Sequence, residues 1–247
     1  ALAAATQSDL AFTSETIASA ISVFGLEAEE ADRVANVYAA TIGSSQASMD
    51  KLAASMRYAG PAAAAFGRSL EETAATLALF YNMGLTGEMA GTRLRNMLSE
   101  LAHPTGEAKK ALDELGISAE QVNPRLNSIA DIIDLLRDKM GLHGISIDLD
   151  WEKIDWENAE QMLDTLHDQG VDTAMAMRIF GKETGPALAS LIALGGDALR
   201  DMERQITGTN KALEMQEIQL DTLMGAQKEL QSVWEAVNIT LGTQSIP

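Results

Sequence analysis

Two pairs of acidic residue and histidine have the types and spacing that could bind a metal. Glu100 and His103 follow the Glu-x-x-His spacing, and Asp164 and His167 form a near variant of it. In a helical bundle, two such pairs and two further glutamates can hold a di-iron site. The first pair stands directly before Pro104, which should end its helix, so we expect solvated helix-end histidines and no metal. A metal-dependent helical-bundle enzyme stays as a third hypothesis, which metal analysis would test.

Two other patterns lack residues that their chemistry needs. Residues 148–152 resemble the start of an EF-hand calcium loop, but Lys and Ala stand where that loop needs Gly and Glu. The glycines from Gly84 to Gly91 precede a helix without the Gly-Lys-Ser/Thr of a phosphate-binding loop. We interpret Gly87 and Gly91 as positions of close backbone contact. The scattered acidic pairs are typical of solvated helix faces, so we expect no catalytic residue and no cofactor.

The composition favours helices that pack through small and flexible side chains. The 247 residues are 46% hydrophobic but only 4% aromatic, with 12 methionines. The net charge of −18 repels duplex phosphate and anionic lipid, so this segment should not grip duplex DNA directly. We expect contact with a host membrane only through other parts of a longer chain. The absence of cysteine excludes disulfides and thiolate sites.

Hydrophobic periodicity predicts an all-α, multi-helix domain of short antiparallel helices. Ser69 precedes Glu72 by three residues, the spacing of a capping box, and predicts a helix start near Leu70. Gly60 and Pro61 predict a turn. The helices are expected over residues 1–25 with a break around 9–14, and then over 26–41, 48–58, 70–83, 88–103, 105–115, 129–140, 158–167, 171–180 and 185–194. Residues 145–149 alternate in polarity but are interpreted as a loop.

The chain opens at Ala1, in a stretch typical of a helix interior, and we expect it to be a piece of a longer polypeptide. Its last part is heptad-patterned, which predicts two parts: a helical core region, 1–206, and an amphipathic or coiled-coil helix, 207–247. Gly225 and Gln227 weaken the coiled coil, so a helix packed on its own domain stays an alternative. The coiled coil would make the protein a homo-oligomer. Its apolar seam consists of Leu213, Leu220, Leu223, Leu230, Trp234, Val237 and Leu241.

Much of residues 1–195 resembles the core region of tape measure proteins from the tails of bacteriophages and prophages. The matching segments are Asp9–Ala40, Tyr58–Ala75, Asn82–Leu98, Leu101–Ser118 and Ile179–Ile192. The glycine–threonine block that begins at Gly84 is the most specific part. The residues that carry the resemblance are Gly60, Pro61, Gly84, Gly87, Gly91, Thr92, Leu94, Leu98, Pro104, Gly116, Phe180 and Gly181.

The resemblance implies a non-enzymatic scaffold whose length sets the length of a phage tail and which is ejected ahead of the DNA. It implies contacts with the tail tube protein, with tail assembly chaperones and with baseplate or tail-tip proteins. It also implies a place in the tail tube lumen or at the tail tip of the virion, after assembly in the host cytoplasm. The residues by themselves leave open a soluble helical adaptor or chaperone-like module, whose Met and Ala stripes would bind a partner.

Overall fold

The computed structural model describes residues 1–142, 159–168 and 170–222 of the chain. This part contains helices and no strand, which confirms the all-α fold class for the described residues. Residues 145–149 lie outside it. The elements are α1 (Leu2–Thr6), α2 (Leu10–Phe24), the 3₁₀ turn η1 (Ala28–Glu30), α3 (Ala31–Gly43), α4 (Met49–Ala65), α5 (Leu70–Asn82), α6 (Gly87–Ala102), α7 (Gly106–Glu114), α8 (Ile129–Lys139), α9 (Ala159–Asp168), α10 (Thr173–Leu194), α11 (Gly196–Ile206) and a helical stretch at 211–222.

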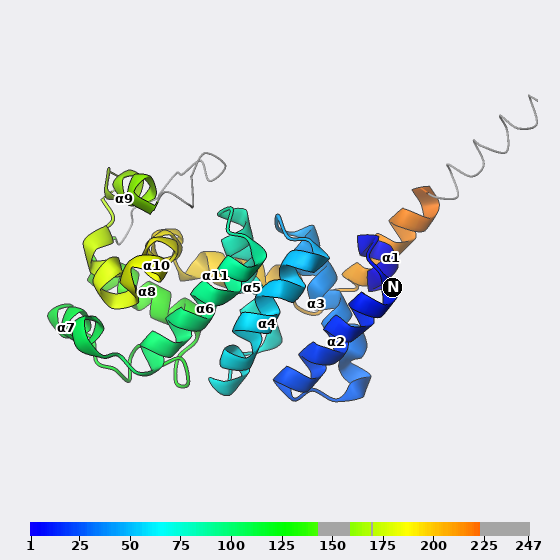
Figure 1. Ribbon diagram of the computed structural model, residues 1–247, viewed down its shortest axis with the longest axis horizontal. Coiled ribbons are helices and arrows are strands. Elements are labelled where there is room, and N and C mark those ends of the chain that lie inside the picture. Colours follow the sequence, from blue (N-terminus) through cyan, green and yellow to red (C-terminus); the bar gives the residue numbers. More distant parts are fainter. Residues whose placement is uncertain (143–158, 169, 223–247) are drawn as a thin grey trace, which may run out of the picture.

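The helices follow one another along the long axis of the molecule (Figure 1). Helices α1 and α2 lie at one end, α7 to α10 lie at the other, and α3 to α6 lie between them. Helix α5 packs against α3, α4, α6 and α11. Because it is covered on several sides, α5 is apolar around most of its circumference rather than along one stripe, and Leu77 and Phe80 are fully buried.

The predicted start of α5 is confirmed. The Ser69 hydroxyl accepts a hydrogen bond from the backbone N–H of Glu72, and the helix begins at Leu70. The Glu72 carboxylate accepts the backbone N–H of Ile129 at 2.6 Å. It therefore ties the start of α5 to the start of α8, 57 residues later in the chain.

The predicted turn at Gly60 and Pro61 is wrong, because both residues lie inside α4. Proline removes one helical hydrogen bond and costs about 3 kcal/mol in a helix interior. Pro61 is exposed, and the alanines that follow it favour helix strongly. Ala59 and Ala63 are fully buried, so the packing of the continued helix offsets the lost hydrogen bond.

Two other helix boundaries also differ from the prediction. The helix expected from Leu26 starts as the turn η1 and becomes α-helical only at Ala31, because the Glu30 carboxylate accepts the Glu27 backbone N–H and fixes a tight turn there. The break expected at residues 180–185 falls at Gly181, where φ is 74° and ψ is 172°, so Pro186 lies inside the second half of α10.

Helix α11 runs back across the body from α8 to α5 and α3. Beyond it, the backbone N–H of Ala212 donates to the Asn36 side chain at 3.0 Å, and the Gln7 side chain donates to Gln219 at 2.9 Å. Residues 211–222 therefore leave the body beside α1, at the end where the chain begins (Figure 1). The division into parts at residue 206 stays a prediction.

Candidate functional site

Helices α4 and α6 cross at two glycines of the predicted block. A Cβ atom on Gly87 would lie 2.7 Å from the Lys51 carbonyl oxygen, and one on Gly91 would lie 2.4 Å from the Ser55 carbonyl oxygen. Real Cβ atoms essentially never approach another atom closer than 3.0 Å, so the two backbones meet where only a hydrogen atom has room. The expectation of close backbone contact at both glycines is confirmed.

A chain of hydroxyl groups fixes this crossing. The Tyr81 hydroxyl of α5 donates to Ser55 Oγ of α4 at 2.6 Å, and Ser55 Oγ donates to the carbonyl oxygen of Gly87 in α6. All three residues are buried. Buried hydroxyl groups need such partners, because an unpaired one loses its hydrogen bonds to water. The pair Ser55–Tyr81 was not predicted from the sequence, although a serine in a buried helix face signals the need for a partner.

The other residues that carry the resemblance to tape measure proteins fall into two groups. Gly60 packs against α2, where an added Cβ would lie 3.3 Å from Val23 Cγ1. Within the block, Leu94 and Leu98 are fully buried and Thr92 is partly buried in α6, while Gly84 has a φ of 96° and links α5 to α6. Most residues of this first group therefore lie on α4 or α6, and Gly87 and Gly91 lie at the crossing itself.

The second group frames α7 and the bend in α10. Pro104 stands before α7, and Gly116, with a φ of 68°, stands after it. Phe180 and Gly181 line one shallow groove with Asn96 of α6. The structure thus brings the bend in α10 beside the second half of α6. A specific role in the family for any residue of either group stays a prediction.

The candidate metal ligands do not converge. The Glu100 carboxylate accepts the backbone N–H of Thr105 at 3.4 Å, and His103 is exposed directly after α6. Asp164 and His167 are exposed on α9. Within the described ranges, no three His, Cys, Asp or Glu side chains are placed to hold a metal ion. Residues 148–152 lie outside them.

A partly buried ion pair that was not predicted joins α3 to α5. The Arg33 guanidinium donates to both carboxylate oxygens of Glu71, at 2.7 and 2.8 Å. The Glu71 side chain is only 8% exposed, so the bidentate pair replaces the water that this carboxylate loses. The hydrogen bond to Glu71 also raises the pKa of Arg33. The sequence offered no clear signal for this pair, because Glu71 and Glu72 both stand in the first turn of α5, where acidic residues are expected.

The carboxylate of Glu203 lies near that of Glu71 but has no ion pair that offsets its burial among the described residues. Burial raises the pKa of Glu203 on α11, and the negative charges of Glu72 and Glu71 raise it further. The contact of α11 with α5 therefore carries an electrostatic penalty at neutral pH.

At the start of α11 the carboxylates are well paired. Asp134 accepts the backbone N–H of Gly196 at 2.7 Å and also binds Arg200 at 2.7 Å. Arg200 reaches Asp131 as well, and Asp131 has a lowered pKa because of its hydrogen bonds with Ser128 and Arg200. Asp134 thereby caps the first turn of α11, and Asp131 holds the Arg200 side chain of the same helix.

Only two residues of the predicted heptad seam lie in the described part. Leu213 and Leu220 are 54% and 48% exposed, and the neighbouring Ile218 is 63% exposed. Leu223, Leu230, Trp234, Val237 and Leu241 lie outside the described residues. A separate property of the described helices is that none is both long and apolar enough to cross a membrane.

Known proteins resemble this chain over most of its length. The tape measure protein of Pneumococcus phage Dp-1 is 30% identical over 239 residues, which are 96% of this chain and 19% of that protein. The probable tape measure protein of Escherichia phage P2 is 29% identical over 228 residues, 90% of this chain and 25% of that protein. The chain thus spans about a fifth to a quarter of the length of these two relatives. No solved structure matches it.

A family model agrees with these relatives. The model described as phage-related minor tail protein matches residues 1–143. That stretch is more than half of the chain and runs from α1 through α8, so it includes the crossing of α4 and α6 with its glycines. The chain therefore belongs to the family of phage-related minor tail proteins.

Proposed function

We propose that this chain forms the helical core region of a tape measure protein, the tail component that sets tail length as the scaffold for tube assembly. The observation that carries the proposal is the similarity, over 90% or more of the chain, to two phage proteins named as tape measure or probable tape measure proteins. The described part supports it, because its regular elements are all helical and two residues of the resemblance, Gly87 and Gly91, lie where α4 and α6 cross.

The body described here is too compact to be the ruler itself. A folded chain of this length has a radius of gyration of roughly 18 Å, and so a body about 45 Å across. A single helix of 206 residues would extend about 310 Å at 1.5 Å per residue. In the described part the longest helix, α10, has 22 residues and is bent. We propose that length is measured by other parts of a longer chain, and that this body lies at the tail end or unfolds to pass the tube.

The partners that suit this role are the tail tube protein, tail assembly chaperones and baseplate or tail-tip proteins. We place the protein in the tail lumen or tip of the virion, after assembly in the host cytoplasm, and propose ejection ahead of the DNA. The partly exposed seam residues Leu213 and Leu220 support self-association through the last helix. In this role the protein is a scaffold without catalytic activity.

Internal deletions in the full-length protein test the proposal. Deletion of this body, if it stays folded in the tail, should shorten the tail by only about 45 Å. Deletion of an equal number of residues from a rod-like helical part should shorten it by about 310 Å. Tail length measured by electron microscopy decides the outcome. Unchanged length after both deletions would favour a helical adaptor or chaperone-like module and contradict the tape measure proposal.

If the body passes through the tail tube, it must unfold readily. A chain without disulfides and with few large aromatic side chains should unfold readily. Thermal unfolding of the purified chain, followed by circular dichroism, should give an ordinary midpoint of about 45–65 °C. A midpoint above about 90 °C would contradict passage through the tube and leave the tail end as the location of the body.

A further inference from the structure

The helix at residues 211–222 turns one side to the body and another to solvent. On the body side, Ala212 is 3% exposed and Met215 packs against the hydrophobic core. On the other side, Leu213 and Leu220 are 54% and 48% exposed. Because an α-helix has about 3.6 residues per turn, the first two residues share one side, and the two leucines share the side next to it. The helix therefore has one covered side and one free apolar edge.

The covered side lies on the end of α3. The backbone N–H of Ala212 donates to the Asn36 side chain of α3 at 3.0 Å. A Cβ atom on Gly43, the last residue of α3, would lie 3.8 Å from the Met215 sulfur, which is an ordinary van der Waals distance. Residues 43 and 215 are therefore close enough to be joined covalently.

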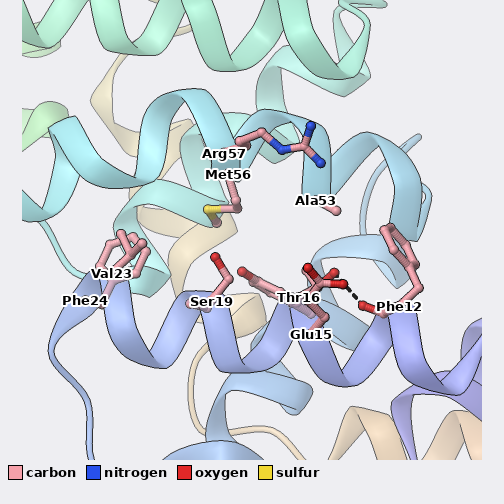
Figure 2. A pocket seen from close by; sticks show the side chains of 11 residues that line it. Phe12, Glu15, Thr16, Ser19, Val23, Phe24, Ala53, Met56 and Arg57 are labelled. Carbon is pink, nitrogen blue, oxygen red and sulfur yellow. Dashed lines mark hydrogen bonds between the residues drawn. The ribbon is translucent and has the colours of Figure 1, made fainter.

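This contact is small and incompletely packed. Met215 borders a hollow whose other walls include Phe12 and Ile42. Phe12 also borders a second hollow, the pocket between α2 and α4 (Figure 2). Side chains that border a hollow make fewer contacts with neighbouring atoms, so little packing energy holds the helix there. Its release from the body therefore costs far less free energy than unfolding of the whole protein.

The heptad pattern of the sequence uses part of the covered side. With Leu213 and Leu220 at position a, Gln216 falls at position d, and Ala212 and Gln219 fall at position g. In a parallel coiled coil, positions a and d form the core of the contact, and positions e and g flank it. Ala212 is already buried against the body. Another helix therefore cannot reach the whole seam while the body covers position g.

The sequence that follows indicates which molecule would pair with this helix. Residues 223–247 lie outside the described part and follow directly on the exposed leucines. In their sequence the apolar a and d positions are Leu223, Leu230, Trp234, Val237 and Leu241. A pattern that continues over about four heptads fits another copy of this chain in the same register, because each apolar residue then meets its own equivalent.

We propose that the helix at residues 211–222 has two mutually exclusive uses. In the single chain it packs on the end of α3, and it leaves the body when copies of the chain pair in parallel through the heptad seam. Docking on the body therefore weakens self-association, because only the chains with a released helix can pair. The inference rests on the proposed self-association through the last helix and adds the contact that regulates it.

Lysine at two adjacent positions separates the two uses. Ala212→Lys puts a charge into the contact with α3, but in the coiled coil it lies at position g and can pair with Glu217 at position e of the other copy. It should tighten self-association of the 247-residue chain by about tenfold or more.

Leu213→Lys is the matched variant, since it changes the net charge equally. It puts the lysine at an exposed position of the docked helix and in the core of the coiled coil. It should weaken self-association by about tenfold or more. Sedimentation equilibrium over a range of protein concentrations measures both changes, and circular dichroism confirms that both variants are folded.

A covalent link tests the exclusion directly. The chain has no cysteine, so Gly43→Cys and Met215→Cys can be combined and joined within one molecule by a short bismaleimide. The linked chain should stay monomeric at concentrations where the unlinked double variant self-associates. Each single variant, capped with N-ethylmaleimide, is the control and should associate like wild type.

Three results would overturn the inference, and they differ in what else they contradict. If the linked chain self-associates and Leu213→Lys abolishes that association, the two uses are compatible, and self-association itself stands. If both lysine variants weaken self-association equally, the contact with α3 belongs to the associated state. If wild type and Ala212→Lys are monomeric at every concentration, self-association through the last helix is wrong as well.

Discussion

The Tyr81 hydroxyl donates to Ser55 Oγ at 2.6 Å, and this contact lies where three helices meet. Tyr81 belongs to α5 and Ser55 to α4, and the Ser55 hydroxyl in turn donates a hydrogen bond to the carbonyl oxygen of Gly87 in α6. The same serine lies under Gly91. The centre of the body thus combines a crossing too close for any side chain with a hydrogen bond that fixes its register.

Gly91→Ala should destabilise the protein. Its Cβ would lie 2.4 Å from the Ser55 carbonyl oxygen, and a backbone oxygen in a helix cannot move aside cheaply. We expect a loss of about 2 kcal/mol or more in the free energy of unfolding, measured by urea denaturation. Gly43→Ala is the control, because its Cβ would meet nothing closer than 3.5 Å. It should stabilise α3 by about 0.5 kcal/mol, and a similar loss in both variants would contradict the argument.

Removal of the two buried tyrosine hydroxyls should have opposite effects. Tyr81→Phe loses the bond to Ser55 and should cost about 1 kcal/mol. Tyr38→Phe removes a buried hydroxyl without a partner in the described part, and should stabilise the protein by about 1 kcal/mol. Chemical denaturation of both variants measures the two values. Equal losses would show that Tyr38 has a hydrogen-bond partner in solution.

Glu71→Gln should weaken the packing of α3 on α5. The change leaves the guanidinium of Arg33 without its bidentate partner, and the Glu71 side chain is 8% exposed. Since the Arg33 side chain is 44% exposed and keeps some water, we expect a loss of about 2 kcal/mol rather than the full cost of a broken buried pair. Glu107→Gln changes the net charge equally but weakens only surface ion pairs, with Lys110 at 2.7 Å and with Arg178 at 3.8 Å. It should leave the denaturation midpoint unchanged.

Glu203→Gln should stabilise the protein at pH 7 and not in acid. The folded state raises the pKa of Glu203, so folding favours the protonated carboxyl and the charged form is destabilising. Solvent screens this half-buried group, so the gain should be about 0.5 kcal/mol. The difference between variant and wild type should shrink as pH falls through the raised pKa and vanish below the ordinary value of 4.5. A difference that is constant from pH 7 to acid would rule out this electrostatic origin.

Local signals were readable from the sequence. Ser69 marked the start of α5, and the spacing of Leu94, Leu98 and their neighbours marked the buried face of α6. Gly87 and Gly91 indicated close contact, though not the partner residues. Pro61 gave the wrong prediction of a turn. The cost of a proline in a helix is local, whereas the packing that outweighs it comes from elsewhere in the chain.

By itself the sequence determined the helical class, most helix starts and the lack of a complete catalytic motif. Helix formation and capping depend on residues within about four positions of one another, so the local sequence is enough to predict them. Only the tertiary structure decided that Gly91 lies on Ser55, that Arg33 meets Glu71 38 residues away, and that the buried Tyr38 hydroxyl has no hydrogen-bond partner in the described part. These relationships depend on which faces distant helices bury against each other. Hydrophobic periodicity in the sequence shows that a helix face is buried, but not which other helix covers it.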